Sequence, residues 1–197
     1  MAAAKLVQAA VARQGTDQVS SSLDDEIAKS AYPRLMGEAF LDRCSPRIRR
    51  IWDYWNQKRG DRPMPSRQDI DPLDIPSDLL PGMLLTEVLK EPPWLRYRLV
   101  GTAQAALRGR DPTGQPVQSH YMGSHLGVTG DEVMLNYRIV IEKRTVVYTY
   151  NPVSGAGPDG SSLRQAPLQA KSSILMPLSS DGETVDMVFC FTDLENP

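Results

Sequence analysis

Two pairs of strand-like segments, each joined by a short turn-forming link, restrict the folds open to this chain. Residues 83–89 and 94–101 are predicted strands on either side of a polar link with two prolines, and residues 168–180 and 183–194 are joined by an Asp-Gly turn. The β-branched and aromatic stretch 145–153 indicates a fifth strand. Two strands, a helical stretch and three strands predict an α+β fold with a mainly antiparallel, five-stranded sheet.

Two amphipathic helices are predicted outside the strands. The first starts at Ser45, which suits a helix N-cap, has Pro46 at its first position and ends at Gly60. A longer helix is predicted at residues 130–144, and a short one precedes Gly109. The apolar residues of the first helix form one stripe, made of Ile48, Ile51, Trp52 and Trp55. Such a stripe requires a surface on which to pack.

Prolines separate the first helix from the strands. Five of them lie between residues 60 and 82, which excludes a long helix or a central strand and predicts a connector with one helical turn at Asp71-Pro72. Residues 15–30, rich in Ser, Asp, Gln and Thr, indicate a linker or tail. The predicted organisation is an N-terminal extension with a possible helix at residues 1–44, the amphipathic helix and connector at residues 45–82, and a core at residues 83–194.

The composition excludes several classes of protein. With 41% hydrophobic and 23% charged residues in 197, the chain suits a soluble globular domain, and a net charge of -2 argues against nucleic acid as a partner. No apolar run is long enough to cross a membrane. Cys44 and Cys190 lie far apart and outside any metal-binding motif, which fits a reducing cytoplasm.

Three stretches of the sequence resemble the signatures of a known family. Residues 52–85, residues 96–117 (RYRLVGTAQAALRGRDPTGQPV) and residues 174–189 (ILMPLSSDGETVDMVF) are similar to a PAS-like family of short alphaproteobacterial proteins, several of them long described as domains of unknown function. The resemblance covers about residues 45–193 and implies a sensory or regulatory module. It further implies that helices cover one face of the sheet and that a small-molecule pocket lies between those helices and the sheet. An N-terminal helix is expected on the other face or across a dimer.

The second predicted strand alternates apolar residues with arginines. In the PAS-like arrangement Leu95, Tyr97 and Leu99 are expected to face the core or pocket, because alternate residues of a strand share a face. The two arginines between them then point outward, where Asp53 or Glu87 could pair with them, or they stay solvated.

Two functional readings follow from the resemblance. The first is a sensor that binds an unidentified small molecule and signals through protein contact; the identity of any cofactor is unknown. The candidate pocket residues are Tyr97, Leu99, Leu107, Met134, Tyr137, Ile141, Tyr148, Met187 and Phe189. The second is a ligand-free adaptor whose own side chains fill the core. In both, the stripe of Ile48, Ile51, Trp52 and Trp55 is the candidate interaction surface for a signalling protein or a homodimer.

Motifs for catalysis and metal binding are weak. Residues 155–160 satisfy GxGxxG, but nearby prolines leave no room for the helix that a dinucleotide site needs. His120 and His125 are the chain's histidines and lie in a Gly-rich stretch, and the neighbouring Ser124 does not form a nucleophile elbow. We therefore expect no catalytic residues, no metal site and no enzymatic activity.

Overall fold

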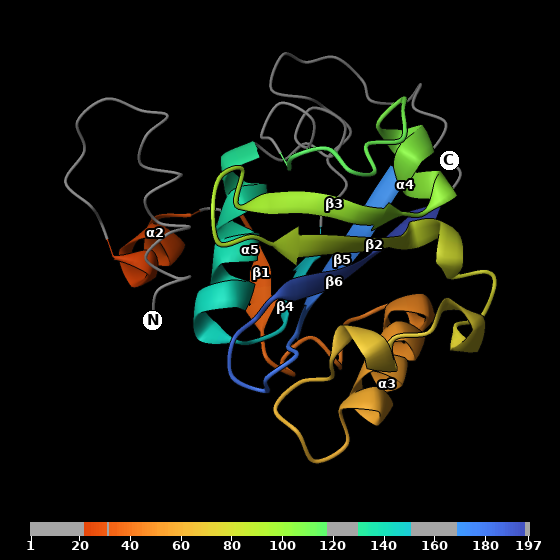
Figure 1. Ribbon diagram of the computed structural model, residues 1–197, viewed down its shortest axis with the longest axis horizontal. Coiled ribbons are helices and arrows are strands. Elements are labelled where there is room, and N and C mark those ends of the chain that lie inside the picture. Colours follow the sequence, from red (N-terminus) through yellow and green to blue (C-terminus); the bar gives the residue numbers. More distant parts are fainter. Residues whose placement is uncertain (1–21, 31, 118–129, 151–168, 196–197) are drawn as a thin grey trace.

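A six-stranded antiparallel sheet organises the computed structural model, which describes residues 22–30, 32–117, 130–150 and 169–195. The strand order is β1-β4-β5-β6-β2-β3 (Figure 1). The strands are β1 (Arg34–Met36), β2 (Met83–Val88), β3 (Leu95–Val100), β4 (Val147–Tyr150), β5 (Gln169–Leu178) and β6 (Met187–Glu195). The α-helices among the described residues are α2 (Leu23–Lys29), α3 (Pro46–Arg59), α4 (Thr102–Leu107) and α5 (Gly130–Lys143). The α+β antiparallel prediction is confirmed, with six strands in place of five.

The additional strand comes from the segment predicted to be an extension. β1 pairs antiparallel with β4, placing Leu35 opposite Tyr148. It is only three residues long; Gly37, with φ +63°, turns the chain after it, and its backbone N–H donates to the carbonyl of Val146 at 2.9 Å. A strand this short carries too little alternation for a sequence pattern to reveal it. Residues 1–21, with the possible first helix, lie outside the described residues.

Helix α2 lies in the stretch 15–30, whose composition indicates a linker or tail. Ser22 caps it, accepting from the backbone N–H of Asp25, while the carboxylate of Asp25 accepts from the N–H of Ser22. Two ion pairs hold this helix to α5, Asp24 to Lys143 at 2.6 Å and Glu26 to Arg138 at 2.5 Å. The polar composition that suggested a linker therefore belongs to a helix docked by its charges.

Helices α3 and α5 lie on opposite faces of the sheet. Tyr137 of α5 contacts Thr86, whereas the guanidinium of Arg47 in α3 lies over the ring of Phe191, 5.6 Å from its centroid. Thr86 pairs with Val188, and Val188 and Phe191 are three positions apart on one strand, so they face opposite ways. We call the face covered by α5 the inner face and the face covered by α3 the outer face.

Local signals set the ends of α3 as the sequence predicts. The Ser45 hydroxyl accepts from the backbone N–H of Ile48, Pro46 occupies the first turn, and Gly60 ends the helix with φ +57°. The connector after it contains three short 3-10 turns: η1 (Arg67–Asp69), η2 (Pro72–Asp74) and η3 (Leu80–Gly82). The sequence predicts one such turn, and η2 is that turn.

The apolar stripe of α3 is buried against the protein's own sheet, which corrects its role as an interaction surface. Trp52 and Trp55 stack with ring centroids 5.2 Å apart, and the indole N–H of Trp55 donates to the carbonyl of Pro177 at 3.1 Å. The four residues Ile48, Ile51, Trp52 and Trp55 are at most 5% exposed. Of the two placements left open, the outer face of the sheet is therefore the one observed.

A β-bulge changes the predicted alternation in β3. Thr86 pairs with Tyr97 but Leu85 pairs with Leu99, so one step along β2 spans two along β3. Because residues paired across strands share a face, Tyr97 lies with Thr86 on the inner face and Leu99 with Leu85 on the outer face. The prediction that Leu99 shares a face with Tyr97 is wrong, since the bulge at residue 98 reverses the alternation.

Candidate functional site

The candidate pocket residues divide between the two faces of the sheet. Tyr97 and Tyr137 meet at the inner face, and Leu107, Met134 and Ile141 belong to α4 and α5. The remaining candidates are paired in register with outer-face residues: Leu99 with Leu85, Tyr148 with Ile174, Met187 with Glu87, and Phe189 with Leu85. The structure thus separates Leu99, Tyr148, Met187 and Phe189 from any inner-face site.

Three neutral polar groups meet at the inner face. The hydroxyl of Tyr137 lies 3.0 Å from Oγ1 of Thr86 and 3.7 Å from Sγ of Cys190. Burial raises the pKa of Tyr137 well above its ordinary value and raises the pKa of the Cys190 thiol to about 12. All three groups are therefore uncharged near neutral pH. Sequence analysis missed Thr86 and Cys190, because both look like ordinary strand residues.

The hydroxyl of Tyr97 is buried without a hydrogen-bond partner among the described residues. The guanidinium of Arg108 lies over the Tyr97 ring, 5.7 Å from its centroid, and its Nε is also buried and unpartnered in this part of the chain. Burial raises the pKa of Tyr97, an effect that the positive charge of Arg108 and a weak side-chain contact between Arg108 and the Tyr97 hydroxyl partly oppose; this contact is not a hydrogen bond of normal geometry. A neutral hydroxyl and a cationic N–H donor thus each have capacity for one further hydrogen bond.

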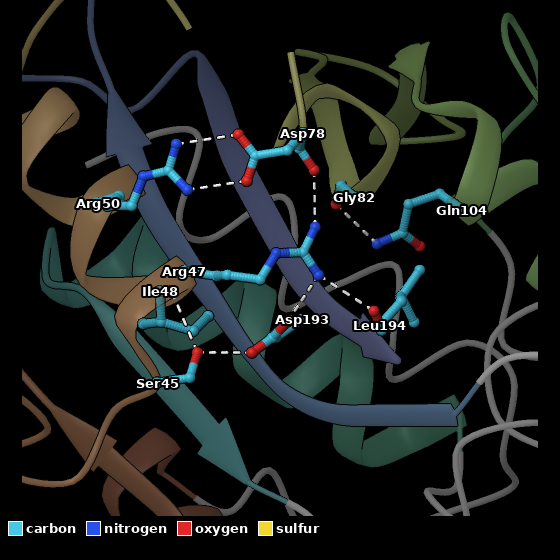
Figure 2. A network of polar contacts seen from close by, with 9 residues as sticks. All are labelled: Ser45, Arg47, Ile48, Arg50, Asp78, Gly82, Gln104, Asp193 and Leu194. Atoms are coloured by element: carbon cyan, nitrogen blue, oxygen red, sulfur yellow. Dashed lines mark hydrogen bonds and ion pairs between the residues drawn. The ribbon is translucent and has the colours of Figure 1, made fainter. Parts of the chain in front are cut away.

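Gln104 fixes the position of Arg108. Its buried side-chain amide donates to the carbonyl of Gly82 at 3.0 Å, as Figure 2 shows, and its Oε1 accepts from NH1 of Arg108 at 2.5 Å. Only glycine fits at position 82, because a Cβ there would lie 2.5 Å from the carbonyl oxygen of Thr192 in β6. Arg108 is therefore anchored at one nitrogen and oriented by packing, while its Nε stays available.

A second polar cluster joins α3 to the end of β6 at the outer face (Figure 2). The carboxylate of Asp193, 2% exposed, accepts from the Ser45 hydroxyl at 2.5 Å and from Arg47 at 2.9 Å. Arg47 also donates to the carbonyls of Leu194 and Asp78, at 3.1 and 2.7 Å. The Asp193 carboxylate accepts from one charged and one neutral donor, so its hydrogen-bonding capacity is used within the protein. We call the contacts of Asp193 with Ser45 and Arg47 the α3 junction.

The outward-facing arginines of β3 behave as predicted. Arg96 and Arg98 approach the carboxylate of Glu87 at 2.6 and 3.6 Å, and both arginine side chains remain exposed. Asp53, the other expected partner, pairs instead with Arg49 one helical turn away, at 3.0 Å. These surface pairs contribute little to stability because water screens them.

The described residues contain no group of three or more potential His, Cys, Asp or Glu metal ligands. In the same part of the chain, no helix combines the length and the apolar character needed to span a bilayer. His120, Ser124, His125 and the GxGxxG segment at residues 155–160 lie outside the described residues, so their predictions stay predictions.

Comparison with known proteins identifies one family. A family model described as "PAS domain" matches residues 43–190, from just before α3 to the middle of β6. No curated protein and no solved structure matches the chain. The match includes both the inner-face groups and the helix that covers the outer face.

Proposed function

The chain belongs to the PAS domain family, a family of sensory and regulatory modules, and on this premise we propose that it detects a small molecule at the inner face of its sheet. The observation that carries the proposal is that two buried atoms, the Tyr97 hydroxyl oxygen and Nε of Arg108, make no hydrogen bond of normal geometry among the described residues. Leaving a buried polar group without a hydrogen bond costs about 1–3 kcal/mol, so a ligand that supplies the missing partner gains this energy on binding.

The chemistry of these groups suggests the ligand class. Arg108 Nε can only donate, whereas the neutral Tyr97 hydroxyl can donate or accept. Leu95, which shares the inner face with Tyr97, is buried, and so is Val117, whose backbone N–H donates to the carbonyl of Leu95 at 2.9 Å. A small, mostly apolar molecule with one carbonyl or carboxylate oxygen satisfies both groups, and the charge of Arg108 favours the carboxylate.

Strand β6 provides a route from this site to the outer face. Cys190 contacts Tyr137 on the inner face, and three positions later Asp193 holds Ser45 and Arg47 of the α3 junction. A ligand that shifts β6 changes the junction only if it binds one arrangement of the strand more tightly than another. We propose that the output is a protein contact made by the exposed side of α3, which carries Arg49 and Gln57.

A non-catalytic role is part of this proposal. Cys190 is the buried thiol nearest the site, and its raised pKa, about 12, keeps it protonated and therefore weakly nucleophilic at neutral pH. The neighbouring tyrosines also have raised pKa values because of burial, so neither is poised to act as a general base.

Native mass spectrometry of the purified protein, compared with its denatured mass, tests ligand binding directly. We expect extra mass that denaturation removes, and we expect Arg108→Met and Tyr97→Phe to lower the retained fraction. Arg98→Met is the matched control, because it removes an exposed arginine from the same strand region. Equal retention in all variants would place any ligand elsewhere.

The ligand-free adaptor remains a second candidate, favoured by the complete burial of Tyr97 and the near-complete burial of Tyr137, at 0% and 3% exposed. In that case the protein carries no extra mass, and Arg108→Met leaves partner binding unchanged. Exposed substitutions on α3, such as Gln57→Glu, would then alter partner binding without any ligand.

A further inference from the structure

Helix α2 lies along α5 and is held there by charge (Figure 1). Its carboxylates Asp24 and Glu26 pair with Lys143 and Arg138 of α5, at 2.6 and 2.5 Å. Asp24 precedes Glu26 on α2 whereas its partner Lys143 follows Arg138 on α5, so the two helices present their charges in opposite chain order. The contact therefore has a defined direction as well as complementary charge.

Docking of α2 depends on few other contacts. The helix has seven residues, and isolated helices this short are unstable in water. Leu23 is its buried residue, at 8% exposed, and Ile27 is partly buried against the same core. The capping box between Ser22 and Asp25 orders the start of the helix from within α2. A small contact of this kind can open locally while the sheet stays folded.

Arg138 is not fully satisfied by α2. Its side chain is 3% exposed; Nη1 donates to Glu26, and Nε donates to Glu142 over a longer distance of 3.3 Å. Nη2 is buried and makes no hydrogen bond among the described residues. A buried donor left unpaired is unfavourable, and one carboxylate can accept from Nη1 and Nη2 of an arginine together. A helix that places a carboxylate across both nitrogens therefore binds this face better than α2 does.

The covering helix and the covered surface belong to different parts of the chain. Helix α5 lies within the PAS match at residues 43–190, whereas α2 and β1 precede the match. Strand β1 is attached independently, through its pairing with β4 and through Arg34, which contacts Glu132 of α5. Release of α2 therefore does not require the sheet to lose a strand.

We propose that the face of α5 around Arg138 and Lys143 is a docking surface for an acidic helix of a partner protein, and that α2 occupies this surface until the partner displaces it. The surface offers two cations and, beneath Leu23, an apolar contact. Its complement is an amphipathic helix that carries carboxylates beside a leucine. A phosphate-rich partner such as nucleic acid matches the cations but not the apolar contact.

This inference does not rest on the proposed ligand site. Arg138 is the neighbour of Tyr137 on α5, but its side chain meets α2, whereas the Tyr137 hydroxyl meets Thr86 of the sheet. The exposed side of α3, which is the proposed output surface, is formed by other residues. Displacement of α2 can be measured with or without a small molecule, so either proposal can fail alone.

NMR titration of the full chain with a synthetic peptide tests the surface. The probe has the sequence of residues 22–30, SLDDEIAKS, and is added to isotope-labelled protein. In wild-type protein α2 competes with the peptide at the high effective concentration of a tethered segment. Glu26→Gln weakens this competitor, so we expect the amide signals of Arg138 and Lys143 to shift at about tenfold lower peptide concentration than in wild type. Asp53→Asn, which neutralises an exposed carboxylate on α3, is the control and should respond like wild type.

A second substitution and a second peptide test specificity. Lys143→Gln changes a side chain that is 34% exposed, so it should leave the fold intact and weaken peptide binding to the Glu26→Gln protein about threefold or more. The NMR spectra themselves report whether each variant is folded. A scrambled peptide of the same composition should produce no comparable shift. Equal responses of wild type and Glu26→Gln, including no response in either, shifts that do not involve α5, or equal binding of the scrambled peptide would each overturn the proposal.

Discussion

The two faces of the sheet differ in how completely their polar groups are satisfied. On the outer face, Asp193 has both Ser45 and Arg47 as donors, and the indole N–H of Trp55 is bonded to a backbone carbonyl. On the inner face, the hydroxyl of Tyr97 and Nε of Arg108 are buried without partners among the described residues. Complete satisfaction is what structural packing requires, whereas unsatisfied buried groups call for a functional explanation.

The largest expected effect breaks the packing of the outer face. Trp55→Ala removes a side chain that is 3% exposed and stacked on Trp52, together with its hydrogen bond to Pro177. We expect a loss of about 3–5 kcal/mol in the free energy of unfolding, measured with chemical denaturant. Gln57→Ala, on the exposed side of the same helix, should change stability by about 0.5 kcal/mol or less. Similar losses in both variants would mean that the stripe is not buried as described.

Breaking the α3 junction has a somewhat smaller expected effect. Asp193→Ala removes an acceptor that the Ser45 hydroxyl and Arg47 share; because Arg47 keeps its backbone acceptors and is partly exposed, we expect a loss of about 1–3 kcal/mol in the free energy of unfolding. The matched control is Asp53→Ala, which breaks the exposed pair with Arg49 and should cost about 0.5 kcal/mol or less. If the two variants unfolded at the same denaturant concentration, the junction would not fix α3 to the sheet.

On the inner face, the buried thiol predicts a dependence of stability on alkaline pH. The pKa of Cys190 rises from 9.0 to about 12 on folding, so above pH 9 the unfolded chain loses a proton that the folded chain keeps. The contribution of this group is therefore fully present below pH 9 and is lost as the pH rises towards 12. Wild-type protein should lose about 1.4 kcal/mol more per pH unit in this window than Cys190→Ala. Parallel pH profiles of unfolding free energy would contradict the assignment.

The sequence predicts the outer face better than the inner one. Ser45, Pro46 and Gly60 are local signals with fixed helical meanings, and the spacing of the tryptophans shows directly which side of α3 is buried. The PAS resemblance adds the expectation that helices cover one face of the sheet and that the N-terminal helix packs on the other face or across a dimer. The role of the stripe was nevertheless wrong, because a periodic pattern shows that a face is buried without showing whether the cover is the same chain or another.

The site was harder to predict because it depends on register. One extra residue in β3 moves Leu99 to the outer face while Tyr97 stays on the inner one, and a bulge has no reliable sequence signal. Thr86 and Cys190 were missed for the same reason, since only strand pairing places them beside Tyr137. The edge strand β1 was missed because its pairing with β4 depends on a segment distant in sequence.

The smallest expected effect on the unfolding free energy comes from comparing two tyrosine hydroxyls of the inner face, one with a hydrogen bond and one without. Tyr137→Phe removes a hydroxyl bonded to Thr86 at 3.0 Å and leaves the threonine unpartnered, which should cost about 1–2 kcal/mol in ligand-free protein. Tyr97→Phe removes a hydroxyl that makes no hydrogen bond of normal geometry and only a weak contact with Arg108, so the unfolding free energy should stay unchanged or rise by about 1 kcal/mol. The two substitutions are chemically identical and both sites are buried, so a difference in the sign of the change in unfolding free energy separates the effect of hydrogen bonding from that of packing.

A loss of stability in Tyr97→Phe equal to that in Tyr137→Phe would show that the Tyr97 hydroxyl is already satisfied. In that case the inner face would be packed as completely as the outer one, and the case for ligand binding there would rest on Arg108 alone.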